Sequence, residues 1–141
     1  MPSFTVLVAD DDESQRNIQK LVLAEVSRSL GAEVVIDEAR DSVQTRKFLE
    51  KKRYDIVVLD NEFKDELSPG HLPGIALLQL MRKGGLNMKS PTIFLTGDPY
   101  DSLRPMAEKY SAIYYQKAKA DTEEMTKMYI KLLSSQIAEH S

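Results

Sequence analysis

The sequence predicts an α/β protein built on a doubly wound, five-stranded parallel sheet with five helices. Short apolar segments alternate with segments of helical periodicity along the whole chain, and most connections between them are only a few residues long. The segment DIVVLD, residues 55–60, is almost continuously apolar, which is typical of a parallel strand buried on both faces. Helices are therefore expected on both sides of the sheet.

The first half of the chain contains three of the expected strands and two helices. The expected elements are strand 4–9, helix 13–30, strand 33–36, helix 42–52 and strand 55–60. In the first helix the apolar residues Ile18, Leu21, Val22 and Val26 recur at helical spacing, and Gly31 follows as a typical stop signal.

The second half continues the alternation after an irregular stretch at residues 61–73. The expected elements are helix 75–83, strand 92–96, helix 102–110, strand 112–116 and a last helix beginning near residue 121. Gly84 and Gly85 end the first of these helices, and Pro105 suits the first turn of the next. Asp121, with Glu124 three places on, resembles a capping box for the last helix.

Composition limits the class of protein. The chain has 141 residues, 42% of them hydrophobic, which suits a single domain spanning 1–141 with no separate output domain. A net charge of −3 argues against direct binding of nucleic acid. There are no cysteines, and no apolar run is long enough to cross a membrane, so a cytoplasmic protein that binds no membrane is expected.

Residues that can bind or accept a phosphoryl group follow four of the five expected strands. Asp10 and Asp11 come after the first strand, Asp60 ends the third, Thr96 ends the fourth, and Lys117 follows the fifth. In a parallel sheet these strand ends lie along one edge, so residues far apart in sequence are expected to be neighbours.

A cluster of three carboxylates implies a cation. At a separation of about 5 Å each ionised pair repels by roughly 3 kcal/mol at an effective dielectric constant near 20. One lysine does not neutralise three acids, and Mg²⁺ accepts a few carboxylate ligands while leaving positions for water and phosphate. With the ion bound, one carboxylate can attack phosphorus and form an acyl phosphate, and Gly97 leaves room beside Thr96 for that group.

Taken singly, each of these residues has an ordinary structural explanation. An acidic run before a helix is often only an N-cap, threonine is common in strands, and a lysine is usually a solvated charge. The hypothesis of a phosphoryl site therefore depends on the joint arrangement of the residues.

That ordered set resembles the receiver domains of two-component response regulators, and in particular a stand-alone receiver. The matching segments are VLVADDDES, YDIVVLD, IFLTG and YYQKA, and the resemblance covers essentially the whole chain. It implies a flavodoxin-like, receiver-type fold.

The resemblance also implies a role for each matching residue. Asp60 would be the phosphoacceptor for a histidine kinase or a histidine phosphotransfer protein. Mg²⁺ would be held by Asp10, Asp11, Asp60 and the backbone carbonyl of Glu62. Thr96 and Lys117 would bind the phosphoryl oxygens, and Tyr114 would be a switch aromatic whose rotamer follows the threonine.

The function implied is a signalling switch and not an enzyme in the usual sense. Phosphorylation would change affinity for an unidentified downstream protein through the fourth helix, fifth strand and fifth helix, in a monomer or weak dimer. Glu62 and Asp98 lie two positions beyond Asp60 and Thr96, where we expect them to influence the access of water and donors.

Two features depart from the family pattern. Ala118 follows Lys117 where the family usually has a proline in a cis peptide, so the geometry of this loop is open. The stretch from Asp60 to Gly74 is longer than usual. We expect this extra segment to cover the acyl phosphate in part or to contribute to partner choice.

Two alternative functions remain. In the first, Asp10, Asp12 and Ser14 begin a phosphatase of the haloacid dehalogenase type, with Asp10 as nucleophile and Asp12 as general acid. The second is a receiver-like scaffold that is never phosphorylated. His71 and His140 are isolated in the sequence and receive no role.

Overall fold

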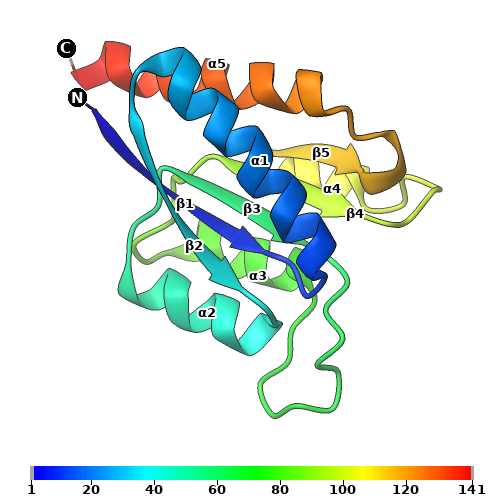
Figure 1. Cartoon of the computed structure of the whole chain (residues 1–141). Coiled ribbons are helices and arrows are strands. Elements are labelled where there is room, and N and C mark those ends of the chain that lie inside the picture. The colour runs from blue at the N-terminus through cyan, green and yellow to red at the C-terminus, as the bar shows by residue number, and fades with distance from the viewer. Residues whose placement is uncertain (1, 141) are drawn as a thin grey trace.

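Strands and helices alternate along the computed structural model, which describes residues 2–140 (Figure 1). The strands are β1 (Ser3–Ala9), β2 (Glu33–Ala39), β3 (Ile56–Asp60), β4 (Thr92–Thr96) and β5 (Ala112–Gln116), and the helices are α1 (Glu13–Leu30), α2 (Ser42–Lys51), α3 (Gly74–Lys83), α4 (Arg104–Lys109) and α5 (Thr122–His140). A short 3₁₀ turn, Lys117–Lys119, separates β5 from α5. The predicted fold class is confirmed.

All strand pairs are parallel, and their order in the sheet is β2-β1-β3-β4-β5. The chain winds outward from β1 to β2 and then returns to β3, so the direction of winding switches between β1 and β3. Ligands of open α/β sheets bind at such a switch point, beyond the carboxyl ends of the strands. The sequence did not determine this order, but it did place the candidate residues at those strand ends.

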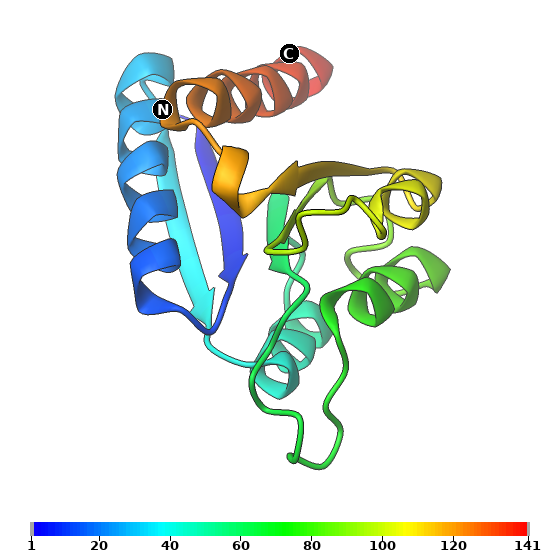
Figure 2. The ribbon, with the colours of Figure 1, turned by 90° about the vertical axis from the view of Figure 1, so that its right-hand side faces the viewer.

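Helices cover both faces of the sheet (Figure 2). Helices α1 and α5 pack on one face, where Val8, Val58 and Leu95 contribute to the core. Helices α2, α3 and α4 cover the other, where Leu7 and Leu59 contribute. Strands β3 and β4 are buried along their whole length, as expected for strands with apolar residues on both faces.

Asp121 caps the start of α5 as predicted, because it accepts a hydrogen bond from the Glu123 backbone N–H, but the described residues show no reciprocal bond from the Glu124 side chain that would complete a capping box. The buried face of α1 differs from the prediction. In α1, Leu21 is 74% exposed. Gln19 is buried instead, because it accepts a hydrogen bond from the Tyr129 hydroxyl of α5. A polar side chain with a buried partner thus replaces a predicted apolar contact.

Some element boundaries also differ from the predictions. Strand β2 continues to Ala39 instead of residue 36, because its backbone pairs with β1 over seven positions. Helix α4 is shorter than expected and begins at Arg104. No peptide bond in residues 2–140 is cis, so the bond from Lys117 to Ala118 is trans, and it enters the 3₁₀ turn.

The long segment 61–73 forms a loop that is closed at its neck. The Gly74 N–H donates to the Asn61 carbonyl at 3.0 Å, and the Asn61 side chain accepts from the Ile75 N–H at 3.0 Å. A Cβ on Gly74 would lie 2.0 Å from the Asp60 carbonyl oxygen, so the neck requires glycine. Figures 1 and 2 show the loop extending beyond the sheet and helices.

A polar cluster fixes the loop to the start of α2. The Asp65 carboxylate accepts from the Ser42 hydroxyl at 2.7 Å and lies 2.7 Å from His71 Nδ1. The Ser42 hydroxyl also accepts from the Leu72 N–H. His71 appeared isolated in the sequence, but it has a structural role. Its partner Ser42 is distant in sequence, and its partner Asp65 is separated from it by an irregular turn, so no spacing pattern identifies either contact.

Candidate functional site

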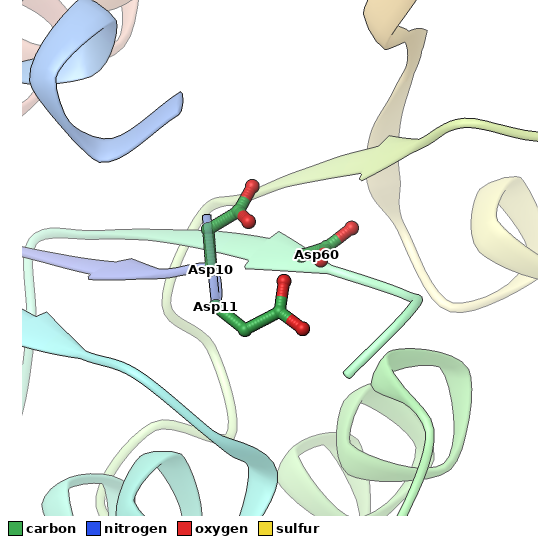
Figure 3. A group of neighbouring side chains, drawn as sticks. All are labelled: Asp10, Asp11 and Asp60. Carbon is green, nitrogen blue, oxygen red and sulfur yellow. The ribbon is translucent and has the colours of Figure 1, made fainter. Parts of the chain in front are cut away.

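Three carboxylates meet at the switch point of the sheet. Asp10 and Asp11 follow β1, Asp60 ends β3, and one carboxylate oxygen from each lies within 4.8 Å of the others (Figure 3). Strand register explains this convergence, because Ala9 pairs with Leu59, which places Asp10, the residue after β1, beside Asp60, the last residue of β3. The predicted acidic cluster is therefore present.

Lys117 reaches this cluster from the end of β5. Its ammonium nitrogen lies 3.0 Å from Asp10 Oδ2 and 3.0 Å from Asp60 Oδ1. The Asp60 side chain is completely buried, and its Oδ2 has no hydrogen-bond partner among the described residues. A buried carboxylate oxygen without a donor is costly, so the site has unused capacity to bind a cation or a phosphoryl group.

The charges shift the pKa values in this pocket. Burial, followed by the Asp10 charge, raises the pKa of Asp60 to about 8, and Lys117 offsets part of that rise. Burial also raises the pKa of Asp10, although the Asp12 N–H and Lys117 act in the opposite direction. The pKa of Lys117 rises despite its burial, because Asp60 and Asp10 stabilise the ammonium form. The carboxylates need more positive charge than the lysine supplies.

Thr96 ends β4 on the same edge, and its hydroxyl has two partners. It donates to the Glu62 carboxylate at 2.5 Å and accepts from the Asp98 N–H at 3.1 Å. The Gly97 N–H donates to the other Glu62 oxygen at 3.3 Å. The side chain of Glu62 therefore lies at the site, where the sequence predicted an influence on the access of water and donors but not these hydrogen bonds. The role of its backbone carbonyl as a metal ligand stays a prediction.

A Cβ on Gly97 would meet no atom within 4 Å. The space beside Thr96 is therefore open, in agreement with room for a transferred group.

The turn between β1 and α1 is fixed by residues that no sequence motif identifies. Arg16 is buried and donates to the Asp10 carbonyl at 2.9 Å, and its Nε lies 3.1 Å from Glu38. The Lys64 N–H of the long loop donates to Asp11 at 2.9 Å. No sequence signal marked Arg16, because the apolar spacing of α1 did not place it on the predicted inward face.

The acidic run before α1 serves both as a helix cap and as part of the acidic cluster. Asp12 is the N-cap of α1, where its carboxylate accepts from the Ser14 N–H. Asp10 and Asp11 belong instead to the acidic cluster.

Tyr114 points into the core beneath α4. Its side chain packs against Phe94, with ring centroids 6.3 Å apart, and the Arg104 guanidinium lies 4.6 Å from its ring centroid. Its hydroxyl is buried without a hydrogen-bond partner in the described residues. Tyr115 packs on the opposite face of the sheet. The inward position of Tyr114 is compatible with a switch, but that role stays a prediction.

Comparison with known proteins supports the fold. No protein-family model and no curated protein matches the sequence. The chain is similar to the receiver domain of Francisella response regulator 1452, with 23% identity over 94% of this chain and 98% of the other and a TM-score of 0.69. It is also similar to chemotaxis protein CheY4 of Vibrio cholerae, with 20% identity, 92% and 98% coverage and a TM-score of 0.69.

A further similar structure is the receiver domain of the sensor histidine kinase PA1611 from Pseudomonas aeruginosa, which has a magnesium ion coordinated in its active-site cleft. The identity is 20%, the coverage 94% of this chain and 98% of that one, and the TM-score 0.65. The chain therefore has the fold of response regulator receiver domains, and the predicted resemblance is confirmed at the level of fold.

Within residues 2–140, no helix is both long enough and apolar enough to cross a membrane.

Proposed function

We propose that this protein is a phosphoacceptor switch that takes a phosphoryl group onto Asp60. The observation that carries this proposal is the buried Asp60 carboxylate, which shares Lys117 with Asp10 and has an oxygen without a donor. The receiver fold supports the same function, because its relatives are response regulators and sensor kinases of two-component signalling.

In the proposed reaction an Asp60 oxygen attacks the phosphorus atom of a phosphohistidine or a small acyl phosphate. The new O–P bond forms as the P–N or P–O bond of the donor breaks, and the electron pair of the broken bond leaves with the imidazole or the carboxylate. Lys117 would neutralise charge on the transferred oxygens, and the Thr96 hydroxyl would donate to one of them. The product is an acyl phosphate.

Mg²⁺ fits the donor set of the pocket. Carboxylate oxygens are its preferred protein ligands, and Asp10, Asp11 and Asp60 each offer one within a small volume. When bound, the ion would supply positive charge that favours approach of a phosphoryl donor to an anionic pocket. The backbone carbonyl of Glu62 is the proposed fourth protein ligand.

The output would be a change in binding to another protein. A new acyl phosphate would draw Thr96 and Lys117 toward it and bias the packing of Tyr114 beneath α4. Such a change can only shift an equilibrium between conformations that the protein already samples. We propose a histidine kinase or histidine phosphotransfer protein as the donor.

The acceptor can be tested with acetyl phosphate and Mg²⁺, followed by mass spectrometry of borohydride-reduced peptides. Modification is expected at Asp60 in the wild type and is expected to be absent from Asp60→Asn. Modification of Asp10 together with steady hydrolysis of phosphate esters would favour the phosphatase alternative instead. That alternative has less support, because its general acid, Asp12, serves as the N-cap of α1.

Phosphotransfer from a panel of the host's histidine kinases tests the signalling role. Transfer to the wild type and its loss in Asp60→Asn are the expected results. If neither kinases nor small donors modify Asp60, the chain acts as an unphosphorylated receiver-like scaffold. Calorimetric titration with Mg²⁺ adds an independent test: binding is expected in the wild type and weaker binding in Asp11→Asn, and absence of any binding would contradict the proposed cofactor.

A further inference from the structure

The carboxylate of Glu62 occupies donors that a phosphoryl group on Asp60 would need. One oxygen accepts from the Thr96 hydroxyl at 2.5 Å, and the other accepts from the Gly97 N–H at 3.3 Å. Glu62 also lies close enough to Asp60 to contribute to the rise in its pKa. A planar anion held by a hydroxyl and an amide beside the acceptor carboxylate resembles the arrangement expected for two phosphoryl oxygens.

The Thr96 hydroxyl has no spare donor for a second anion. A hydroxyl carries one proton, and here that proton is used for Glu62 while the oxygen accepts from the Asp98 N–H. Thr96 is fully buried, which makes an unpaired hydroxyl unfavourable and favours retention of some acceptor. A phosphoryl oxygen can therefore bind Thr96 only after Glu62 withdraws.

We propose that Glu62 is an internal competitor of the phosphoryl group, which it replaces in the unmodified protein. This inference rests on the proposed function, and it concerns a positioning residue rather than a catalytic one. The competition slows phosphoryl uptake, and it keeps Thr96 facing the pocket before any phosphoryl group arrives. Displacement of Glu62 toward the base of the long loop then connects modification of Asp60 to that loop, since Glu62 is its second residue.

The inward position of Tyr114 agrees with this arrangement. Tyr114 is only 7% exposed, and the Thr96 hydroxyl is held by Glu62. Removal of Glu62 should therefore loosen Thr96 in the unmodified protein.

The test uses the full chain and beryllofluoride, a stable phosphoryl analogue, together with acetyl phosphate. Glu62→Ala is expected to bind beryllofluoride and to take up phosphate from acetyl phosphate roughly tenfold better than the wild type, because a hydrogen-bonded anion no longer has to be displaced. Glu62→Gln, which keeps an acceptor without the charge, is expected to lie between them. Equal rates and affinities in the wild type and Glu62→Ala would overturn the proposal.

Glu13→Gln is the matched control for charge. It removes one negative charge in the first turn of α1, from an exposed side chain that makes no hydrogen bond to Thr96 or Gly97 in the described residues. Its uptake rate is expected to change less than twofold. A change as large as that of Glu62→Ala would show that general electrostatics, and not competition for Thr96, is responsible.

A double-mutant comparison isolates the Thr96 contact. In a Thr96→Ala background the advantage of Glu62→Ala should shrink markedly, because the contested hydroxyl is absent. Thermal unfolding of every variant verifies that the comparison is made between folded proteins. Persistence of the full advantage without Thr96 would overturn the proposal.

The backbone amide signal of Gly97, measured by NMR without any phosphoryl donor, separates failure of this inference from failure of the proposed function. It should move toward the position of a weaker hydrogen bond in Glu62→Ala and stay unchanged in Glu13→Gln. An unchanged signal in Glu62→Ala would refute the contact itself. If the signal moves but Asp60 accepts neither beryllofluoride nor phosphate in any variant, the phosphoacceptor function fails and the competition proposal falls with it.

Discussion

The ammonium nitrogen of Lys117 lies 3.0 Å from a carboxylate oxygen of Asp60, although Asp60 ends β3 and Lys117 follows β5, two strands that are not neighbours in the sheet. This pair lies over β4, which separates β3 from β5. The long lysine side chain spans that distance and brings positive charge to a carboxylate that the β-strand core has fully desolvated. Several consequences of this geometry can be measured.

Removal of the ammonium group should destabilise the metal-free protein. Lys117→Met leaves Asp10 and Asp60 without their cation, and we expect a loss of about 2 to 3 kcal/mol in the free energy of unfolding at pH 8, less than for a fixed buried charge because Asp60 can take up a proton. Urea unfolding measures the loss. Lys119→Met, an exposed lysine of the same turn, is the control, and equal effects in the two variants would contradict the assignment.

Stability of the metal-free protein should fall as pH rises. Because the pKa of Asp60 is about 8 in the folded protein and near 3.8 when unfolded, the folded state holds more protons between these values. This group therefore reduces stability progressively from about pH 4 to pH 8, by at most about 1.4 kcal/mol per pH unit. Urea unfolding across this range should show the slope, and Asp60→Asn should flatten it. If the slope is the same in Asp60→Asn as in the wild type, other groups cause the pH dependence.

Mutation of the neck glycine should be far more damaging than mutation of another glycine in the same helix region. In Gly74→Ala the new Cβ would lie 2.0 Å from the Asp60 carbonyl oxygen, so the backbone beside the acceptor must move. We expect a loss of more than about 2 kcal/mol in thermal or urea unfolding. Gly84→Ala, whose Cβ meets nothing within 4 Å, should cost less than about 1 kcal/mol. Similar losses would mean that the neck relaxes freely.

Shortening the loop should alter signalling more than folding. Replacing residues 65–71 by two glycines keeps the Asn61 and Gly74 contacts but removes the Asp65 cluster and the fully exposed Leu67. We expect a several-fold change in acyl phosphate lifetime or in preference among kinases, measured by phosphotransfer assays. Leu67→Ser changes only an exposed side chain of the loop, so it separates the role of Leu67 from that of the Asp65 cluster. If lifetime and preference both stay unchanged after the shortening, the loop has neither role.

The sequence correctly predicted the features that depend on hydrophobic periodicity and on the residues at the strand ends. Alternating elements predicted the parallel sheet, and the sheet in turn brought Asp10, Asp60 and Lys117 together without any knowledge of strand order. The side-chain contacts of Glu62 and His71 could not be predicted in this way. Both lie in an irregular loop, where the position of a side chain is set by its tertiary partners and not by a repeating pattern.

Apolar spacing also failed where a polar side chain had a buried partner. The prediction for α1 counted Leu21 as inward, whereas Gln19 takes a buried position through Tyr129 of α5. No single-helix pattern contains that information, because the partner belongs to a distant segment.

The narrow closure between Asn61 and Gly74 has a consequence for how this molecule can diversify. Since the backbone at the closure is fixed by its own hydrogen bonds, residues 65–71 of the loop can be exchanged or lengthened while the acceptor stays in place. Related chains could therefore acquire new binding properties through changes in the sequence of this one loop. A protein engineer could use the same position to graft a binding peptide beside the chemistry.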